Sequence, residues 1–250
     1  MSPGFLYASH ASRAHDAASV GAVLRNADRR PPWLIVDHTV GSVIVSQWPG
    51  RLFEVEVVDP VGPEDLAAVK QPGLLPGAGY TRAVAVRVLA ELEAAKLFGE
   101  HGAAVVDVLE RARRLSLEGA QLLADADDPR AGRCYSNAWN AWLQAEKRGD
   151  SIHAGQDHAR TLEIPARQRA PSPIGHGLSV VYQIVRHQAQ QVGGEAALLI
   201  DEDGESRLAP PWDHAADALL HAVMALGAPR LVSQDDRRHL LRAWEMLERG

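Results

Sequence analysis

The segment at residues 50–66 reads GRLFEVEVVDPVGPEDL, and its first half alternates apolar with polar side chains. A period of two is typical of a β-strand with one buried face. The apolar positions of this alternation are Phe53, Val55 and Val57. The run ends at Asp59-Pro60, and the turn that follows carries two adjacent acids, Glu64 and Asp65. We therefore predict a strand over Leu52–Val58 with two carboxylates beyond its end.

Further strands are predicted on both sides of this segment. The alternation recurs over Tyr80–Leu89, and the short apolar runs Phe5–Ala8 and Trp33–Val36 predict two more strands. Residues 13–26 place apolar side chains at helical spacing, which predicts a helix. Residues 39–50 fit both a short helix and a strand. A long connection rich in glycine and proline joins the two alternating strands, and such connections are often functional.

Beyond Gly99 the apolar side chains recur almost throughout at helical spacing. The sets are Val105, Val108, Leu109 and Ala112; Tyr135, Ala138, Trp139 and Trp142; Leu178, Val181, Tyr182 and Val185; Leu219, Leu220, Val223 and Met224; and Leu240, Leu241, Trp244 and Leu247. Helix starts are predicted at Asp213 and at Ser233, which Asp236 follows as in a capping box. Residues 149–177 contain three prolines and no sustained period. We predict an α+β protein, with a mixed α/β domain at residues 1–98 and an α-helical domain at 99–250 that includes a long loop at 149–177.

The composition is that of an ordinary soluble globular protein, because 46% of the 250 residues are hydrophobic and 23% are charged. The formal net charge of -6 repels a phosphate backbone, so we expect no nucleic-acid partner. The sequence shows no targeting leader, and no apolar stretch approaches the ~18 residues of a membrane span. The single cysteine, Cys134, suits a reducing compartment and is predicted to be a packing residue. We expect a cytoplasmic protein with no membrane partner.

The order of the first elements and of three short motifs resembles the ADP-ribosyltransferase superfamily, particularly its small rifampicin-modifying branch. The motifs are Gly62-Pro63-Glu64-Asp65, Pro76-Gly77 and Tyr80-Thr81-Arg82, and the resemblance spans residues 5–98. It implies an ADP-ribosyltransferase-like fold for this part of the chain. It also implies NAD as cofactor and transfer of ADP-ribose to a small-molecule or protein acceptor, through an oxocarbenium-like ribose that a carboxylate stabilises.

The resemblance also implies a role for each site residue. Glu64 or Asp65 would be the catalytic carboxylate, and Tyr7, Ser9 or His10 would hold the ribose. Trp33 or Tyr80 would stack on nicotinamide, and Arg82 would lie near phosphate. The chain departs from the branch at the first strand, where Leu6-Tyr7-Ala8-Ser9 replaces a His-Gly-Thr motif.

This departure supports a second hypothesis, a non-catalytic binding or regulatory protein. In it the first domain is a degenerate scaffold, a pseudoenzyme, and the tryptophan-rich helices contact a protein partner or a second copy of the chain. Glu64 and Asp65 would then only begin a short helix at Leu66–Val69, favoured by the helix dipole. The tryptophans at helical spacing are predicted to be core or interface anchors.

Histidines raise two further possibilities. Asp37 and His38 follow a predicted strand as a possible acid-base pair, although adjacent strand residues face opposite sides. His153, His158 and His176 lie in the predicted loop, but their spacing matches no strong zinc template, so we predict no metal site.

Overall fold

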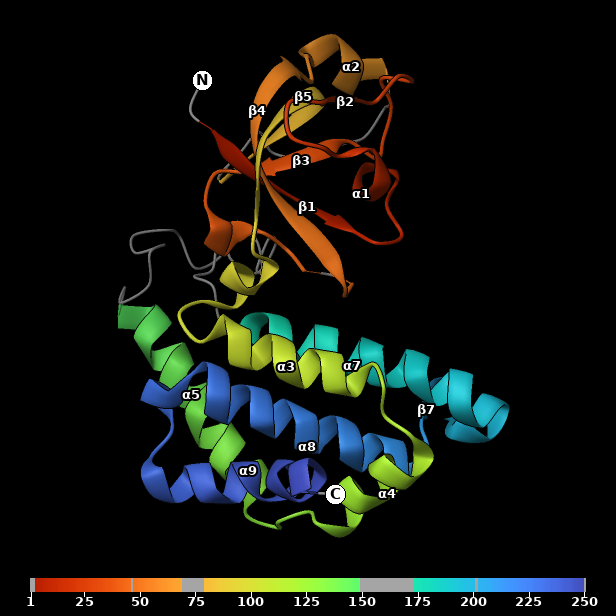
Figure 1. The fold of residues 1–250 in the computed structure, drawn as a ribbon, viewed down its shortest axis with the longest axis vertical. Helices are drawn as coiled ribbons and strands as arrows, with labels where there is room; N and C mark the ends of the chain where they lie inside the picture. The colour runs from red at the N-terminus through yellow and green to blue at the C-terminus, as the bar shows by residue number, and fades with distance from the viewer. Residues whose placement is uncertain (1–2, 46, 69–78, 149–172, 201, 250) are drawn as a thin grey trace. The chain divides into compact units, whose positions relative to one another are not determined.

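A computed structural model describes residues 3–45, 47–68, 79–148, 173–200 and 202–249. It is a mixture of helix and strand, as the α+β prediction requires. The chain divides into two compact units. The described residues 3–97 form the first, a strand unit, and residues 98–148 and 173–249 form the second, a helical unit (Figure 1).

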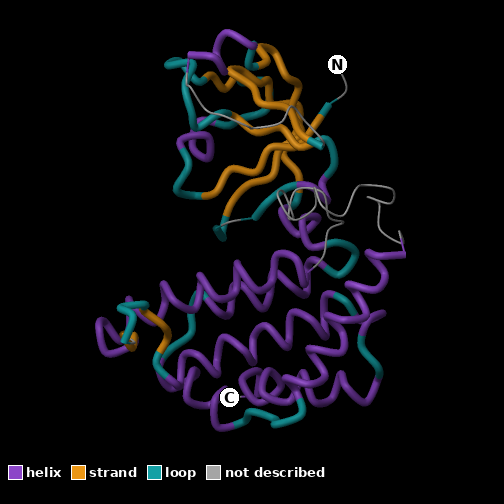
Figure 2. Tube along the Cα trace, turned by 180° about the vertical axis from the view of Figure 1, so that it is seen from behind, coloured by secondary structure: helices purple, strands orange, loops and turns teal. Residues whose placement is uncertain are grey.

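The strand unit is a closed antiparallel sheet of five strands, shown in orange in Figure 2. The strands are β1 (Gly4–Ser9), β2 (Val23–Arg25), β3 (Leu34–Asp37), β4 (Gly50–Pro60) and β5 (Tyr80–Leu92). The order is β2-β5-β3-β1-β4, and an additional pairing of β4 with β5 closes the ring. The long strand β5 makes this possible, because β3 pairs with its first residues and β2 pairs further along it, while β4 pairs with its opposite edge.

Alternating side chains of all five strands fill the inside of this ring. The core consists of Leu6, Ala8, Ala18, Leu24, Val36, Phe53, Val55, Val57, Ala83, Val86 and Val88. Phe53 and Val55 are fully buried, so the period-two pattern is confirmed over residues 53–58, whereas Leu52 is also fully buried and departs from it. The remaining elements of the unit are short: α1 (Arg13–Ala17), the 3-10 turn η1 (Val40–Ser42) and α2 (Pro63–Ala68).

The predicted helix at residues 13–26 is wrong beyond Ala17. Leu24 lies in β2, pairs with Val86 and points into the core of the ring. Burial against β5 therefore decides the conformation there, although the apolar spacing of the segment also fits a helix.

The helical unit is arranged around one central helix. Its α-helices are α3 (Gly102–Ala112), α4 (Leu117–Asp125), α5 (Ala131–Arg148), α7 (Pro173–Gly193), α8 (Pro210–Gly227) and α9 (Gln234–Arg249). The 3-10 turns η3 (Gly194–Ala197) and η4 (Pro229–Leu231) and the hairpin of β6 (Leu198–Ile200) with β7 (Ser206–Leu208) complete its described elements, and the 3-10 turn η2 (Ala94–Phe98) joins the strand unit to it in the chain. Helix α8 contacts each of the other α-helices named above. Eleven of its 18 residues are buried, as expected for a central helix, while Asp213, His214 and Asp217 are exposed.

Two predicted helix starts have different outcomes. The start at Ser233 is confirmed, because its hydroxyl accepts a hydrogen bond from the Asp236 backbone N–H at 3.0 Å. The start at Asp213 is wrong, since α8 already begins at Pro210, a residue that suits the first helical position.

The predicted loop at residues 149–177 lies outside the described residues as far as residue 172, and His153 and His158 are in that part. Residues 173–177, which include His176, belong to α7, so the loop prediction is wrong there. Proline at the first position of a helix has a favourable φ and no N–H to leave unpaired, which explains a start at Pro173. No described helix is both long enough and apolar enough to cross a membrane.

Candidate functional site

The two acids beyond β4 lie in the first turn of α2 and have different surroundings. The Arg29 guanidinium binds both oxygens of Asp65, with Nε donating to Oδ1 at 2.9 Å and Nη2 donating to Oδ2 at 2.8 Å. The Gly62 backbone N–H donates to the same carboxylate at 3.0 Å. Only 11% of the Asp65 side chain is exposed. Glu64 is exposed, and no hydrogen bond or ion pair joins its carboxylate to another described residue.

Arg29 also connects this turn to the end of β4. Its Nη1 donates to Asp59 Oδ2 at 2.9 Å, and Arg25 lies 3.9 Å from the same oxygen. The backbone of Arg29 has a φ of +48°, which non-glycine residues seldom adopt, so the contacts around it hold it there. The hydrogen bonds from Arg29, followed by that from Gly62, lower the pKa of Asp65 below its ordinary value. Asp65 is therefore an ionised carboxylate whose charge a guanidinium already matches.

The predicted ribose-binding residues lie at the end of β1. The Tyr7 hydroxyl donates to the Gln47 carbonyl at 2.8 Å, and its burial raises the pKa of the phenol. The ring lies so close to Gly50 that a Cβ there would be 2.4 Å from the ring. Ser9 is half-buried and pairs with Gly50, whereas His10 is exposed. Tyr7 is thus committed to contacts inside the strand unit.

The residues predicted to contact nicotinamide and phosphate lie at the start of β5. Tyr80 is buried, and its hydroxyl accepts a hydrogen bond from Arg82 Nη2 at 2.9 Å. The Arg82 guanidinium carbon is 5.6 Å from the centre of the Tyr80 ring, in a cation-π contact. The structure therefore brings Tyr80 and Arg82 together. Trp33 is half-buried and directly precedes β3.

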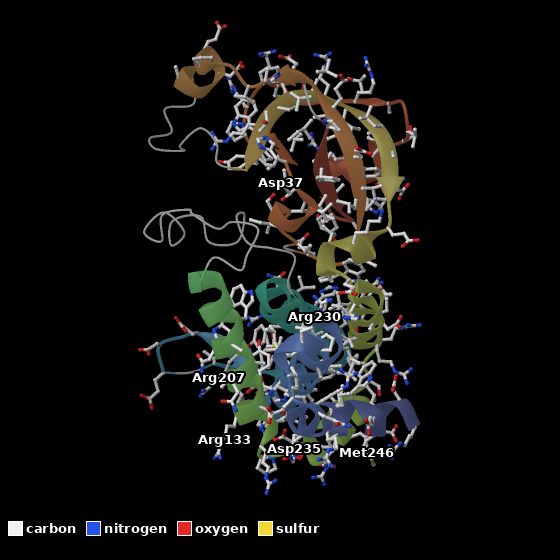
Figure 3. All side chains as sticks on the ribbon, turned by 90° about the vertical axis from the view of Figure 1, so that its left-hand side faces the viewer. Asp37, Arg133, Arg207, Arg230, Asp235 and Met246 are labelled. Carbon is white, nitrogen blue, oxygen red and sulfur yellow. The ribbon has the colours of Figure 1, made fainter. Side chains whose placement is uncertain are left out.

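Asp37, labelled in Figure 3, lies opposite Tyr80 in the pairing of β3 with β5 and is buried. The next residue, His38, is exposed, and one of its ring nitrogens is 2.9 Å from the Thr81 hydroxyl. The two residues therefore have different neighbours, as expected for adjacent residues of an extended chain.

The predicted carboxylates follow the last residue of β4, whereas the predicted ribose-binding residues Tyr7 and Ser9 pair with its first residues. Ser9 pairs with Gly50 at the start of this strand, and α2 follows Pro60 at its end (Figure 1). The strand has 11 residues, so at about 3.3 Å per residue its ends are about 30 Å apart along the chain.

These positions do not fit the arrangement around NAD that the resemblance implies. Cleavage of the nicotinamide bond requires the carboxylate and the ribose-binding groups at the same sugar. Here one carboxylate is paired with Arg29, the other is exposed, and the groups on β1 lie near the start of β4. Arg82 occupies one face of Tyr80 and its hydroxyl, which are the contacts that a nicotinamide would need.

Sequence reasoning missed Arg29, which determines the state of Asp65. In the sequence, residues 26–32 predict only a break between a helix and the next strand. The one signal in it is Asn26, a residue that organises turns through its side chain. Its amide donates to the carbonyls of Arg30 and Pro32 at 2.7 and 3.0 Å.

In the helical unit, the predicted packing role of Cys134 agrees with its surroundings. The thiol is buried, and burial, followed by the hydrogen bond with Asp236, raises its pKa to about 11. A thiol in this state is a poor nucleophile at neutral pH. Trp142 and Trp244 are buried in the core, as predicted for anchors, while Trp139 is half-buried.

Comparisons with protein-family models, with curated proteins and with solved structures found no match. The ADP-ribosyltransferase-like fold and NAD as cofactor therefore stay predictions from the sequence.

Proposed function

We propose that this protein is a non-catalytic binding or regulatory protein whose strand unit is a degenerate ADP-ribosyltransferase-like scaffold. The observation that carries the proposal is the bidentate pair between Asp65 and Arg29, at 2.8 and 2.9 Å. A carboxylate that stabilises an oxocarbenium-like sugar must direct its charge at that sugar. Asp65 directs its charge at a guanidinium of its own chain, in the geometry that makes such pairs strongest.

The other predicted site residues support the same proposal. Tyr7 is engaged with Gln47, and Tyr80 with Arg82. These contacts are what a scaffold needs for its own stability, and they leave few of the predicted groups available to a dinucleotide.

The helical unit supports a binding role, because it exposes apolar side chains outside its core. Leu199 and Ile200 in the hairpin strand β6 are 43% and 75% exposed. Consecutive strand residues face opposite sides, so the hairpin presents an apolar side chain on each of its two faces. A protein partner that contacts the helical unit is therefore part of the proposal.

A second candidate is an NAD-dependent ADP-ribosyltransferase, and the exposure of Glu64 favours it. Among the described residues nothing neutralises this carboxylate. In this candidate Glu64 alone is the catalytic acid, and Asp65 serves only to hold α2 through Arg29.

Nicotinamide release from NAD by the full chain separates the two candidates. We expect no release above the buffer rate and no change of Tm with NAD. A bound ligand at 100 times its Kd would add about 2.7 kcal/mol to the free energy of unfolding. Release that is lost in Glu64→Gln and kept in Glu118→Gln, an exposed acid in the first turn of α4, would overturn the proposal in favour of the enzyme.

Arg29→Gln provides a second test of the same proposal. It frees Asp65 from its guanidinium, so an intact site blocked only by Arg29 would gain NAD cleavage. A degenerate scaffold gains none. The matched control is Arg87→Gln, which removes another half-exposed arginine of the strand unit that pairs with Glu56 at 3.2 Å.

A further inference from the structure

The helical unit contains a group of polar and aromatic side chains that the proposed function does not use. On α8, Asp213, Asp217 and His221 are four residues apart in succession, which places them along one side of the helix. On the neighbouring helix α5, Tyr135, Trp139 and Trp142 are spaced four and three residues apart. Helices α5 and α8 contact each other (Figure 1).

The rings of these residues form a continuous row. The ring centres of His221 and Tyr135 are 5.5 Å apart, those of Tyr135 and Trp139 are 6.4 Å apart, and those of Trp139 and Trp142 are 5.2 Å apart. Trp142 is buried, whereas Tyr135 and Trp139 are only half-buried, so part of the row reaches solvent.

Two polar groups at one end of this row lack partners among the described residues. The Tyr135 hydroxyl is buried and has no hydrogen bond. His221 is 8% exposed and no hydrogen bond joins its ring to another described residue, but its ring nitrogens are not among the fully buried unpartnered atoms. Buried polar groups in proteins nearly always have a hydrogen-bond partner. A ligand bound beside Tyr135 would supply the partner that its buried hydroxyl lacks.

The acids beside this row form no ion pair with another described residue, and the basic residue whose charge acts on Asp217 is His214. None of Asp127, Asp213 and Asp217 has an ion-pair partner within the part of the chain that the structure describes. The Asp217 side chain is exposed; partial desolvation, followed by the charge of Asp213, raises its pKa, and the charge of the neighbouring His214 opposes this shift. Burial, followed by the charge of Asp217, raises the pKa of the neighbouring Tyr135 to about 12. The local field is negative, and it favours a cation.

The surrounding groups favour an organic cation over a metal ion. The described residues contain no group of three or more His, Cys, Asp or Glu side chains arranged to hold a metal. Aromatic faces attract alkylammonium groups, because the ring face is negative and the alkyl carbons are apolar. Burial lowers the pKa of His221, so its ring is neutral at neutral pH and offers one nitrogen as an acceptor.

We propose that the face between α5 and α8 binds a primary alkylammonium group, with Asp217 as its counter-ion and the rings of Tyr135 and Trp139 against its carbons. A primary ammonium carries three N–H donors. The Asp217 carboxylate, the Tyr135 hydroxyl oxygen and the neutral His221 ring provide three acceptors. The ammonium belongs either to a free amine or to a lysine side chain of another protein.

Calorimetric titration of the full chain with n-butylammonium chloride tests this site at constant ionic strength. We expect saturable binding, and at least about fivefold weaker binding of tetramethylammonium, which has no N–H donor. We expect none for 1-butanol, which has the same chain length and no charge. Equal binding of 1-butanol, or no saturable binding of n-butylammonium, would overturn the proposal.

Substitutions test which side chains bind the ammonium group. Asp217→Asn is expected to weaken binding by about tenfold or more, because it removes the counter-ion and keeps the shape of the side chain. The control is Asp107→Asn, the same change on an exposed position of α3, which should leave the affinity unchanged. Trp139→Leu is a second variant and should weaken binding through loss of a ring face. Equal affinities in Asp217→Asn and Asp107→Asn would contradict the assignment.

The source of the ammonium group follows from a comparison of ligands. Nα-acetyl-lysine N-methylamide presents the same ammonium on a peptide backbone. Binding at least about fivefold tighter than that of n-butylammonium assigns the site to a lysine of a protein partner, and binding of equal strength assigns it to a free amine. Failure of the lysine derivative to bind while n-butylammonium binds excludes the protein source. None of these outcomes depends on whether the strand unit cleaves NAD.

Discussion

Substitution of Tyr135 by phenylalanine should increase the stability of the helical unit. The change removes one hydroxyl and keeps the ring, so the contacts with His221 and Trp139 persist. The hydroxyl is buried without a hydrogen bond in the described structure. A buried polar group in that state costs about 1–3 kcal/mol. Removing it should therefore raise the free energy of unfolding by about that amount in the absence of ligand.

Urea denaturation followed by circular dichroism measures this change. A shift of the midpoint with no change of slope would show that stability alone has changed. The control is Tyr182→Phe on α7, a half-buried tyrosine whose hydroxyl is not among the buried unpartnered atoms. Such a substitution should alter stability by less than about 0.5 kcal/mol.

The outcome also bears on the alkylammonium site. Destabilisation by Tyr135→Phe of more than about 1 kcal/mol would mean that the hydroxyl has a stabilising partner in the free protein, and the reasoning from an unpartnered group would be refuted. With n-butylammonium present at saturation, the stabilising effect of Tyr135→Phe should shrink, because the wild-type hydroxyl then has a partner.

Three further predictions concern packing and pH. Trp212→Ala should destabilise the helical unit by about 3–5 kcal/mol in the same assay, because this large side chain is only 2% exposed. Gly50→Ala should destabilise the strand unit by about 1–3 kcal/mol, since its Cβ would lie 2.7 Å from the backbone oxygen of Ala8. Gly132→Ala, which meets nothing within 4 Å, is the control and should be neutral or stabilising. The hydrogen bond from His239, 2.9 Å away, lowers the pKa of Asp128 from its ordinary 3.8. The stability that this lowered pKa contributes is fully present above the pKa of Asp128 in the unfolded chain. It is lost as the pH falls through the lower pKa of Asp128 in the folded protein. Below about pH 4, the free energy of unfolding should therefore fall less with decreasing pH in Asp128→Asn than in the wild type. An equal fall in the two proteins would contradict this prediction.

The strands of the first unit could be predicted from the sequence where the period was unambiguous. In β4 and β5 the apolar side chains alternate over many residues, and a one-residue slip would place all of them on the solvent side. The helical unit was predictable for the same reason, because Val105, Val108 and Leu109 share one face of α3 and are all buried. Periodicity over several turns therefore identified most of the described elements.

Short segments failed because local pattern and tertiary pairing compete there. Val23 and Leu24 fit the apolar face of a helix, but the free edge of β5 offers them backbone partners and Leu24 a place in the core. Three residues are too few for alternation to be visible. The closure of the ring by β4 and β5 was equally beyond prediction, because it depends on the length and curvature of two strands and on irregularities in their register.

The pair of acids at residues 64 and 65 shows why a candidate site needs more than its own motif. In the sequence, Glu64 and Asp65 are adjacent acids in the same predicted helix turn. No sequence feature indicates which of the two carboxylates is available for chemistry. In the structure one is exposed and the other is held by Arg29, 36 residues earlier in the chain. An Arg–carboxylate pair of this kind forms when two surface segments come into contact in the folded protein. No local sequence pattern predicts that contact. The same reasoning applies to Tyr135 and His221, whose shared surroundings arise from the packing of α5 on α8. Whether a polar residue is available for chemistry is therefore a property of its tertiary neighbours, and at both places the decisive neighbour is distant in sequence.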